Sequence, residues 1–290
     1  MAQTGLSASR PVRRAGSAAA SVGRIALYVV LVCLSVVTLI PFVWMLSSSL
    51  KLDREVFEFP IRWIPKVFHW ENYSLIWTKA PMLMYFKNTA VVAVCVTLIQ
   101  TMTSSFAAYA FAKLEFRFRD TLFLCYIATI AVPWQAYMIP QFIEFRSIGL
   151  YDTLLAIMVL QAFSAFGVFL MRQFYRGIPT ELCEAARIDG LSEYGIWARI
   201  MLPLSRPAIA TLVIFTFIGT WNDYMGPMIY LTTESVKTVQ VGLRRFIQEN
   251  SSDYHLIMAA SMVSLIPVSV VFLALQRYFI EGIATSGLKG

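Results

Sequence analysis

Residues 181–207 read ELCEAARIDGLSEYGIWARIMLPLSRP, the longest charge-bearing break between apolar runs in the second half of the chain. Thr180 is a candidate N-cap, and Glu181 falls in the first turn of a helix, where the helix dipole favours an anion. Gly190 suits the left-handed residue that ends a helix, and Ser192 can cap a second one. The stretch therefore predicts two short helices joined at a glycine.

The second predicted helix runs towards Arg199, and Pro203 marks the next break. The first helix is acidic, with four carboxylates and one base between residues 181 and 193. An amphipathic helix that lies on the anionic inner lipid surface would instead be basic. Two interpretations remain: a solvated acidic loop between membrane helices, or a helix that seats in a groove of a partner protein. The charged residues are Glu181, Glu184, Arg187, Asp189 and Glu193.

The composition is that of an integral membrane protein. Of 290 residues, 58% are hydrophobic and only 14% are charged, with a mean hydropathy of +0.65. A soluble domain of this length would carry about a quarter charged residues. The formal net charge of +7 is therefore read against membrane sidedness and does not indicate nucleic-acid binding. Four cysteines without paired spacing and two isolated histidines predict neither a disulfide framework nor a metal site.

Six apolar runs are long enough, or nearly so, to cross a bilayer as helices, which needs about 20 residues. The sequence thus predicts an all-α polytopic protein with one transmembrane domain over residues 25–290 and a cytoplasmic loop at 175–206. Residues 1–24, rich in Ala, Ser and Arg, read as a disordered cytoplasmic tail rather than a cleaved signal peptide. The predicted spans are 25–46, 88–112, 121–143, 153–171, 207–231 and 256–276.

The distribution of basic residues predicts that both termini lie in the cytoplasm. Lysine and arginine gather in short cytoplasmic loops. With the N-terminus inside, the inner segments hold fourteen of the 24 bases. The short loop 113–119 and the tail at 10–14 decide the orientation, because long loops count for less. The acidic stretch then faces the cytoplasm.

No pattern of catalytic chemistry is present in the sequence. There is no G-x-x-x-x-G-K-[ST] phosphate loop, no H-E-x-x-H and no Ser/His/Asp or Cys/His set. We therefore expect no enzymatic activity and no cofactor of its own. If transport is driven, the work must enter through a contact with another protein.

The spacing of the acidic stretch has a specific counterpart. Glu184-Ala185-Ala186, three residues, Gly190, nine residues, Ile200, one residue and Leu202-Pro203 reproduce the EAA motif of permease subunits of bacterial ABC importers. The chain resembles the MalG-like, carbohydrate branch of that family from about Ile25 to Gly290. The resemblance also rests on SSFAAYAFAKLEFR, LPLSRPAIATLVIFTFIGTWNDYMGPMIYL and YFIEGIATSGLKG.

The resemblance implies a type I importer permease in the bacterial inner membrane, with sugars or related polyols as substrates. Its implied partners are a second, MalF-like permease, a dimeric ABC ATPase, an extracytoplasmic substrate-binding protein and membrane lipid. Glu184 would offer a carboxylate to a basic residue of the ATPase, and Gly190 would set the angle of the docking helix. The remaining coupling residues would shape this helix or fix it to the bundle: Ala185, Ala186, Asp189, Ile200, Leu202 and Pro203.

A second candidate site lies in the fifth predicted span, where Trp221, Asn222 and Asp223 follow one another. An ionisable group in an apolar run indicates function by default, and a flat ring beside polar groups suits a sugar. The alternative is a structural carboxylate satisfied by a neighbouring helix. Two interpretations also apply to Gln100, Gln135 and Gln161: these residues line a transport path, or they make hydrogen bonds between helices. A self-sufficient secondary transporter or channel using Asp223 is the competing function.

Overall fold

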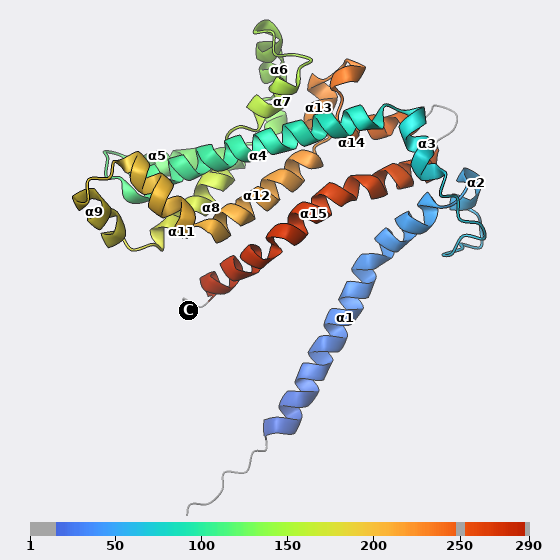
Figure 1. Cartoon of the computed structure of the whole chain (residues 1–290), viewed down its shortest axis with the longest axis horizontal. Coiled ribbons are helices and arrows are strands. Elements are labelled where there is room, and N and C mark those ends of the chain that lie inside the picture. The colour runs from blue at the N-terminus through green and yellow to red at the C-terminus, as the bar shows by residue number, and fades with distance from the viewer. Residues whose placement is uncertain (1–15, 248–252, 288–290) are drawn as a thin grey trace, which may run out of the picture.

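The protein is a helical bundle with one long helix that diverges from it (Figure 1). The computed structural model describes residues 16–247 and 253–287. Helices α4 (Met82–Lys113), α8 (Ala165–Arg176), α12 (Arg206–Trp221) and α15 (Tyr254–Gly287) pack along one another. The C-terminal end of helix α1 (Gly16–Ser49) packs against α15, and the rest of α1 points away from the bundle (Figure 1).

Length and composition identify the candidate membrane spans in the part of the chain that the structure describes. Three helices qualify: Gly23–Ser49, Met82–Lys113 and Tyr254–Tyr278. The number rises to five if each of two bent helix pairs is one span. Helices satisfy their own backbone groups, which lipid cannot do. The predicted all-α class is thus confirmed, with three to five candidate spans where the sequence predicts six.

The predicted run 121–143 is not one continuous helix. Helix α5 (Arg119–Ala128) gives way to short 3-10 turns at Thr129–Ala131 and Trp134–Ala136 before α6 (Met138–Ser147) begins. Pro133 explains the interruption, because it lacks an N–H and pushes the preceding residue out of the helical region. Val132 accordingly has φ −87° and ψ 109°. Hydropathy alone does not reveal this break.

Two further predicted spans are also interrupted. Residues 153–171 form α7 (Leu154–Leu160) and α8, which meet at an angle of 46°. Ser164 caps α8 by accepting a hydrogen bond from Gly167 N at 3.0 Å. Residues 207–231 form α12 and then α13 (Met225–Tyr230). The second candidate site, Trp221 to Asp223, lies at the break between α12 and α13.

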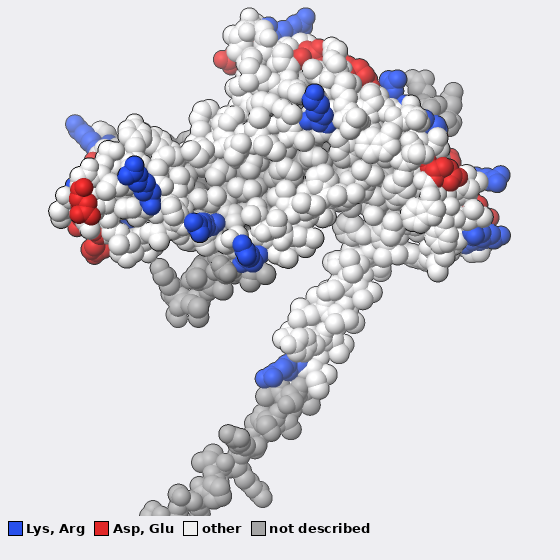
Figure 2. Space-filling view, in the orientation of Figure 1, with Lys and Arg blue, Asp and Glu red and all other residues white. Residues whose placement is uncertain are grey.

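The two ends of the bundle are built from short helices. One end carries α9 (Glu181–Ile188), α10 (Glu193–Ile196), a π-helical segment Trp197–Met201 and α11 (Leu202–Leu204). The opposite end carries α2 (Asp53–Val56), α3 (Asn72–Lys79), α14 (Val239–Gly242) and 3-10 turns at Glu234–Val236 and Leu243–Phe246. On the visible face, charged residues gather at both ends of the bundle and on the part where α6 and α7 stand out from it. The surface between them is mostly uncharged (Figure 2).

Helix α1 contributes little to the core. Its described side chains from residue 23 to 42 are all exposed, and its first buried residue is Ser47. The predicted tail 1–24 falls mostly on residues 1–15, which lie outside the described residues. Helix α1 itself begins at Gly16, before the predicted end of that tail.

Candidate functional site

The acidic helix α9 begins one residue after Thr180, as the sequence predicts, but Thr180 does not cap it. The side chain of Thr180 makes no capping hydrogen bond, and its backbone is already helical. The hydroxyl instead accepts a hydrogen bond from Lys113 Nζ at 3.3 Å, and the same amine donates to Ile178 O at 2.5 Å. The predicted N-cap is therefore wrong: the backbone of Thr180 is already helical, and its hydroxyl contacts a buried lysine at the end of α4.

Helix α9 divides into a buried and an exposed face. Cys183 and Ala186, three residues apart, are buried in a cluster with α4, α8 and α10. Glu184 and Ala185 are exposed, and Ile188 is 87% exposed. The exposed face of α9 therefore carries acidic side chains and, near its end, one aliphatic side chain. Asp189 is also exposed, at the C-cap.

The end of α9 is confirmed as predicted. Gly190 has φ +83°, the left-handed region that favours glycine. Leu191 N donates to Ala186 O at 3.0 Å, and Gly190 N donates to Arg187 O at 3.0 Å. This pair of bonds is the Schellman motif. A side chain at Gly190 would meet no atom within 4 Å, so its requirement is conformational and not steric.

The second helix is also confirmed, but its end differs from the prediction. Ser192 Oγ accepts a hydrogen bond from Gly195 N at 3.3 Å and caps α10. The chain does not break at Pro203, which lies in the first turn of α11, where its missing N–H costs little. The change of direction comes at Ser205, between Glu193–Leu204 and Arg206–Trp221, which meet at 82°.

A charged clasp connects the two short helices to α4. Arg187 Nε donates to Glu193 Oε1 at 2.6 Å, and Tyr109 Oη donates to Glu193 Oε2 at 2.5 Å. These bonds, the one from Arg187 first, hold the pKa of the Glu193 carboxyl below its usual range. Because Tyr109 belongs to α4, the clasp links the α9 end to a long helix of the bundle.

The residues after α9 attach it to the bundle in a way the sequence only partly indicates. Ile200 is half-buried against the same cluster, whereas Leu202 is half-buried outside it and Pro203 is exposed. Met201 is fully buried and its sulfur lies 3.8 Å from Cys183 Sγ. Sequence reasoning missed Met201. The three-residue spacing of Cys183 and Ala186 was the available signal for a buried face.

The three residues of the second candidate site point in different directions. Trp221 is buried and its indole N–H donates to Ser264 O at 3.1 Å on α15. Asn222 is exposed and accepts a hydrogen bond from Gln240 at 3.2 Å. Asp223 accepts hydrogen bonds from Gly226 N at 3.2 Å and Gln161 Nε2 at 2.7 Å. Its carboxylate thus stabilises the start of α13.

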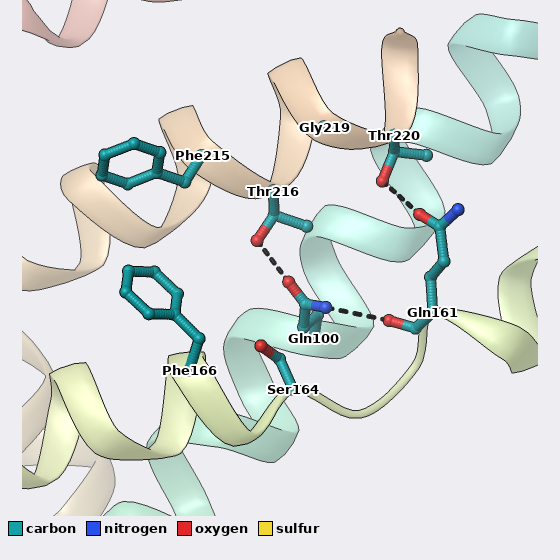
Figure 3. Close-up of a pocket in the computed structure, with 8 residues that line it drawn as sticks. All are labelled: Gln100, Gln161, Ser164, Phe166, Phe215, Thr216, Gly219 and Thr220. Carbon is teal, nitrogen blue, oxygen red and sulfur yellow. Dashed lines mark hydrogen bonds between the residues drawn. The ribbon is translucent and has the colours of Figure 1, made fainter. Parts of the chain in front are cut away.

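A chain of amides and hydroxyls connects α4, the α7–α8 break and α12, all parts of candidate membrane spans (Figure 3). Gln100 Nε2 donates to Gln161 O at 3.1 Å, and Thr216 donates to Gln100 Oε1. Thr220 donates to Gln161 Oε1 at 2.6 Å. Gln100 and Gln161 therefore make interhelical hydrogen bonds, and they also line an open pocket of ≈ 230 Å³.

No group of three His, Cys, Asp or Glu side chains that could hold a metal ion occurs among residues 16–247 and 253–287. The acidic residues at the α9 end are spread over a helix surface. Glu193 is held by Arg187 and Tyr109. The arrangement suits contact with a protein.

The sequence of the chain matches a described protein family. Residues 100–285 match the family of the "Binding-protein-dependent transport system inner membrane component". The matched stretch includes both the α9 end and the polar chain.

Individual relatives cover nearly the whole chain. The arabinooligosaccharides transport system permease protein AraQ of Bacillus subtilis is 30% identical, over 93% of this chain and 97% of its own length. The melibiose/raffinose/stachyose import permease MelC of the same species is 34% identical, over 87% and 91%. A sn-glycerol-3-phosphate permease, UgpE of Yersinia enterocolitica, is 32% identical over 84% and 90%.

The fold is similar to that of a solved transporter. A chain in the crystal structure of a bacterial ABC transporter involved in the import of the acidic polysaccharide alginate superposes with a TM-score of 0.80. It is 26% identical, and the match covers 91% of this chain and 98% of that one. The likeness therefore extends over most of the chain.

Proposed function

The chain belongs to the family of binding-protein-dependent transport system inner membrane components, and from this premise we propose that it forms half of an ATP-driven sugar import path. Membership makes it a permease subunit of an ABC importer in a bacterial inner membrane, without catalytic activity of its own. The proposal adds the substrate class, the partner contacts and the coupling residues.

The substrate class rests on what the relatives' names record. Arabinooligosaccharides and melibiose, raffinose or stachyose are the substrates named for two relatives. The alginate importer adds an acidic polysaccharide, and a third relative is named for glycerol phosphate. Polyhydroxylated compounds are common to all of them. We therefore propose sugars or oligosaccharides for this chain.

The acidic helix α9 is our proposed contact with the ATPase. The observation that carries the proposal is its exposed face, where Glu184 stands beside Ala185 and the exposed side chain of Ile188 lies one turn away. Glu184 would pair with a basic residue in a cleft of the ATPase, a directional charge-assisted bond. Ala185 would let the backbone approach closely. ATP and Mg²⁺ would be bound by the ATPase dimer.

Motion of α9 would reach the bundle through two attachments. The clasp of Arg187, Glu193 and Tyr109 leads to α4, and the buried contact of Cys183 with Met201 leads to α12 through α11. Packed elements move as units because close-packed interfaces resist continuous deformation. Closure of the ATPase would thus rotate the long helices with α9.

Six spans and cytoplasmic termini complete the proposed topology. We assign the spans to α1, α4, α5–α6, α7–α8, α12–α13 and α15, counting broken helices as single crossings because irregular backbone is tolerated where protein or a water-filled path covers it. The end that carries α9 would be cytoplasmic, and the end with α2, α3 and α14 would meet the substrate-binding protein. The bias of lysine and arginine supports this orientation.

The second permease would pack against α1. Between Gly23 and Ser49 the most apolar 18-residue window of α1 has no buried residue within this chain. Lipid alone could solvate such a helix. Because α1 diverges from its own bundle, however, its exposed surface is available to pack against the helices of a partner. A MalF-like permease is the partner that we propose. Because drive would come from the ATPase, we do not retain the alternative in which Asp223 couples transport to an ion.

The test of the coupling proposal is a charge reversal with a matched control. In the importer assembled from this chain, its partner permease, ATPase and binding protein, Glu184→Lys should abolish copurification of the ATPase and ATP-driven sugar uptake. Glu181→Lys changes an exposed acid in the first turn of the same helix and should retain most of both. Membrane insertion of the two variants should be equal. Wild-type uptake by the Glu184→Lys importer would refute the proposed role.

A further inference from the structure

The polar chain at membrane depth opens into a pocket that no coupling residue uses. Gln100, Gln161, Thr216 and Thr220 line it, together with Phe166 and Gly219 among others (Figure 3). It lies between α4, the α7–α8 break and the second half of α12. We propose that this pocket is a substrate subsite belonging to this chain, for one ring of a neutral sugar. The inference rests on the proposed function as a sugar importer.

The pocket is too polar to open onto lipid. Exposed amides and hydroxyls in hydrocarbon lose water without gaining a partner. Polar side chains at membrane depth therefore face a bundle interior or a water-filled cavity. The pocket is open, with ≈ 230 Å³ of space, so a fixed helix contact within this chain does not fill it. An aqueous path that a polar solute enters is the setting that matches its lining.

The hydrogen bonds already made leave a mixed set of donors and acceptors. Each amide, Gln100 and Gln161, uses one N–H in the chain and keeps a second. Thr216 and Thr220 donate their hydroxyl protons to these amides and keep oxygen lone pairs. Ser164 Oγ accepts from Gly167 N and keeps its proton. The same pocket thus both donates and accepts, as a hydroxyl ligand requires.

The lining carries no charge, and this selects the ligand class. None of its described side chains is Lys, Arg, Asp or Glu. Asp223 stands behind Gln161 and is not part of the lining. An anionic group such as a phosphate or a uronate would be desolvated here without a cation, whereas a neutral hydroxyl would find a partner of either sense. The subsite therefore fits neutral sugars better than acidic ones.

Two aromatic rings and a glycine give the pocket its shape. Phe166 and Phe215 stand edge to face, with ring centroids 5.9 Å apart and an interplanar angle of 86°. Apolar ring faces beside a few placed polar groups are typical of small-molecule sites. At Gly219 an added Cβ would meet no atom within 4 Å. The helix would therefore tolerate a side chain there, which would occupy space next to the pocket.

The experiment measures selectivity in the assembled importer. Wild-type proteoliposomes are given a ladder of neutral mono-, di- and oligosaccharides, and deoxy analogues of the best substrate, with the cognate binding protein. Gly219→Leu should reduce uptake of the larger sugars more than that of the smaller ones. Thr216→Val should lower uptake of the best sugar by about 3- to 10-fold, the effect of one hydrogen bond, and should not lower uptake of the deoxy analogue that lacks the contacted hydroxyl.

Two further measurements separate a subsite from a structural role. Thr211→Val removes a hydroxyl on the same helix that donates to Pro207 O at 2.9 Å outside the pocket, and should leave the selectivity unchanged. Thr211→Val should also retain ATPase stimulation by loaded binding protein. Equal losses for all sugars, or unchanged uptake in both pocket variants, would overturn the subsite alone. If the wild-type importer took up no neutral sugar, the proposed function would fall together with the subsite.

Discussion

Helices α9 and α1 both leave the bundle, yet they do so in opposite ways. The eight-residue α9 buries Cys183 and Ala186 and turns acids outward. The 34-residue α1 is apolar around its circumference, and its side chains from residue 23 to 42 are exposed. One helix is anchored by its own chain and presents charge to water. The other is unsupported by its own chain and presents hydrocarbon. The contrast is consistent with the two partners that we propose, an ATPase in water and a second permease in the membrane.

The largest effect on helix α9, which its own chain anchors, is expected at Ala186. Ala186→Arg places a guanidinium without a partner at a position that is 5% exposed, and should destabilise the α9 end by about 3–5 kcal/mol. Ala185→Arg changes the exposed neighbour and should leave the fold intact while weakening ATPase copurification. Limited proteolysis at the α9 end of the purified chain distinguishes the two. Equal protease sensitivity would contradict the buried face of α9.

Two side-chain truncations, one on α4 and one on α1, test whether α1 is supported by its own chain. Val96→Ala on α4 removes methyl groups at a position that is 0% exposed and should cost about 1–3 kcal/mol of stability. Leu34→Ala on α1 removes a side chain that is 58% exposed and should change the unfolding of the isolated chain by less than about 0.5 kcal/mol. Thermal unfolding in detergent measures both. Leu34→Ala should act instead on copurification of the second permease. A large loss of intrinsic stability would mean that α1 is supported by its own chain.

The clasp gives the anchoring of α9 a pH dependence. Since Arg187 holds the folded-state pKa of Glu193 below its ordinary value, the stabilisation is present above the unfolded pKa, about 4.3. It is lost as pH falls through the lower, folded pKa. Glu193→Gln should cost about 1 kcal/mol at neutral pH for this half-exposed pair.

That difference should vanish as the pH falls through the lowered, folded-state pKa of Glu193, as hydrogen exchange at α9 would show. Glu184→Gln, at an exposed acid of the same end, is the control. A difference between wild type and Glu193→Gln that does not change with pH would contradict a charge-dependent clasp.

The most local expected effect is at the cap of α10. Ser192→Ala removes the acceptor for Gly195 N and should cost about 1 kcal/mol of local stability. Amide exchange at Gly195 should accelerate, while exchange in α1 stays unchanged. Acceleration that extends to α1 would show that the two protruding helices are not independent.

The sequence predicts α9 well because its determinants are local. The left-handed Gly190 and the Ser192 cap each depend on a few neighbouring residues, and the acidic face is visible in the order of the charges. The predicted Thr180 cap is wrong because the backbone of Thr180 is already helical and its hydroxyl contacts Lys113, 67 residues away. Long-range competition of this kind leaves no local signature.

The second candidate site and the polar chain are less predictable, because their contacts join residues that are far apart in the sequence. Hydropathy shows that residues 121–143 are apolar but not that Pro133 interrupts them. It also does not show which way Trp221 points, since its partner Ser264 lies on another helix. Gln100 and Gln161 are visible as polar residues in apolar runs, but only packing brings them together. Contact between substrate and Asn222 or Asp223 stays a prediction.

Cysteine crosslinking at Ile188 tests the central claim most directly, because this exposed residue forms the tip of the acidic helix. In the assembled importer, with Cys33, Cys95, Cys125 and Cys183 replaced, Ile188→Cys should crosslink to the ATPase subunit. In intact cells it should resist a membrane-impermeant thiol reagent added from outside. Labelling by that reagent, or no crosslink to the ATPase while uptake persists, would contradict the account.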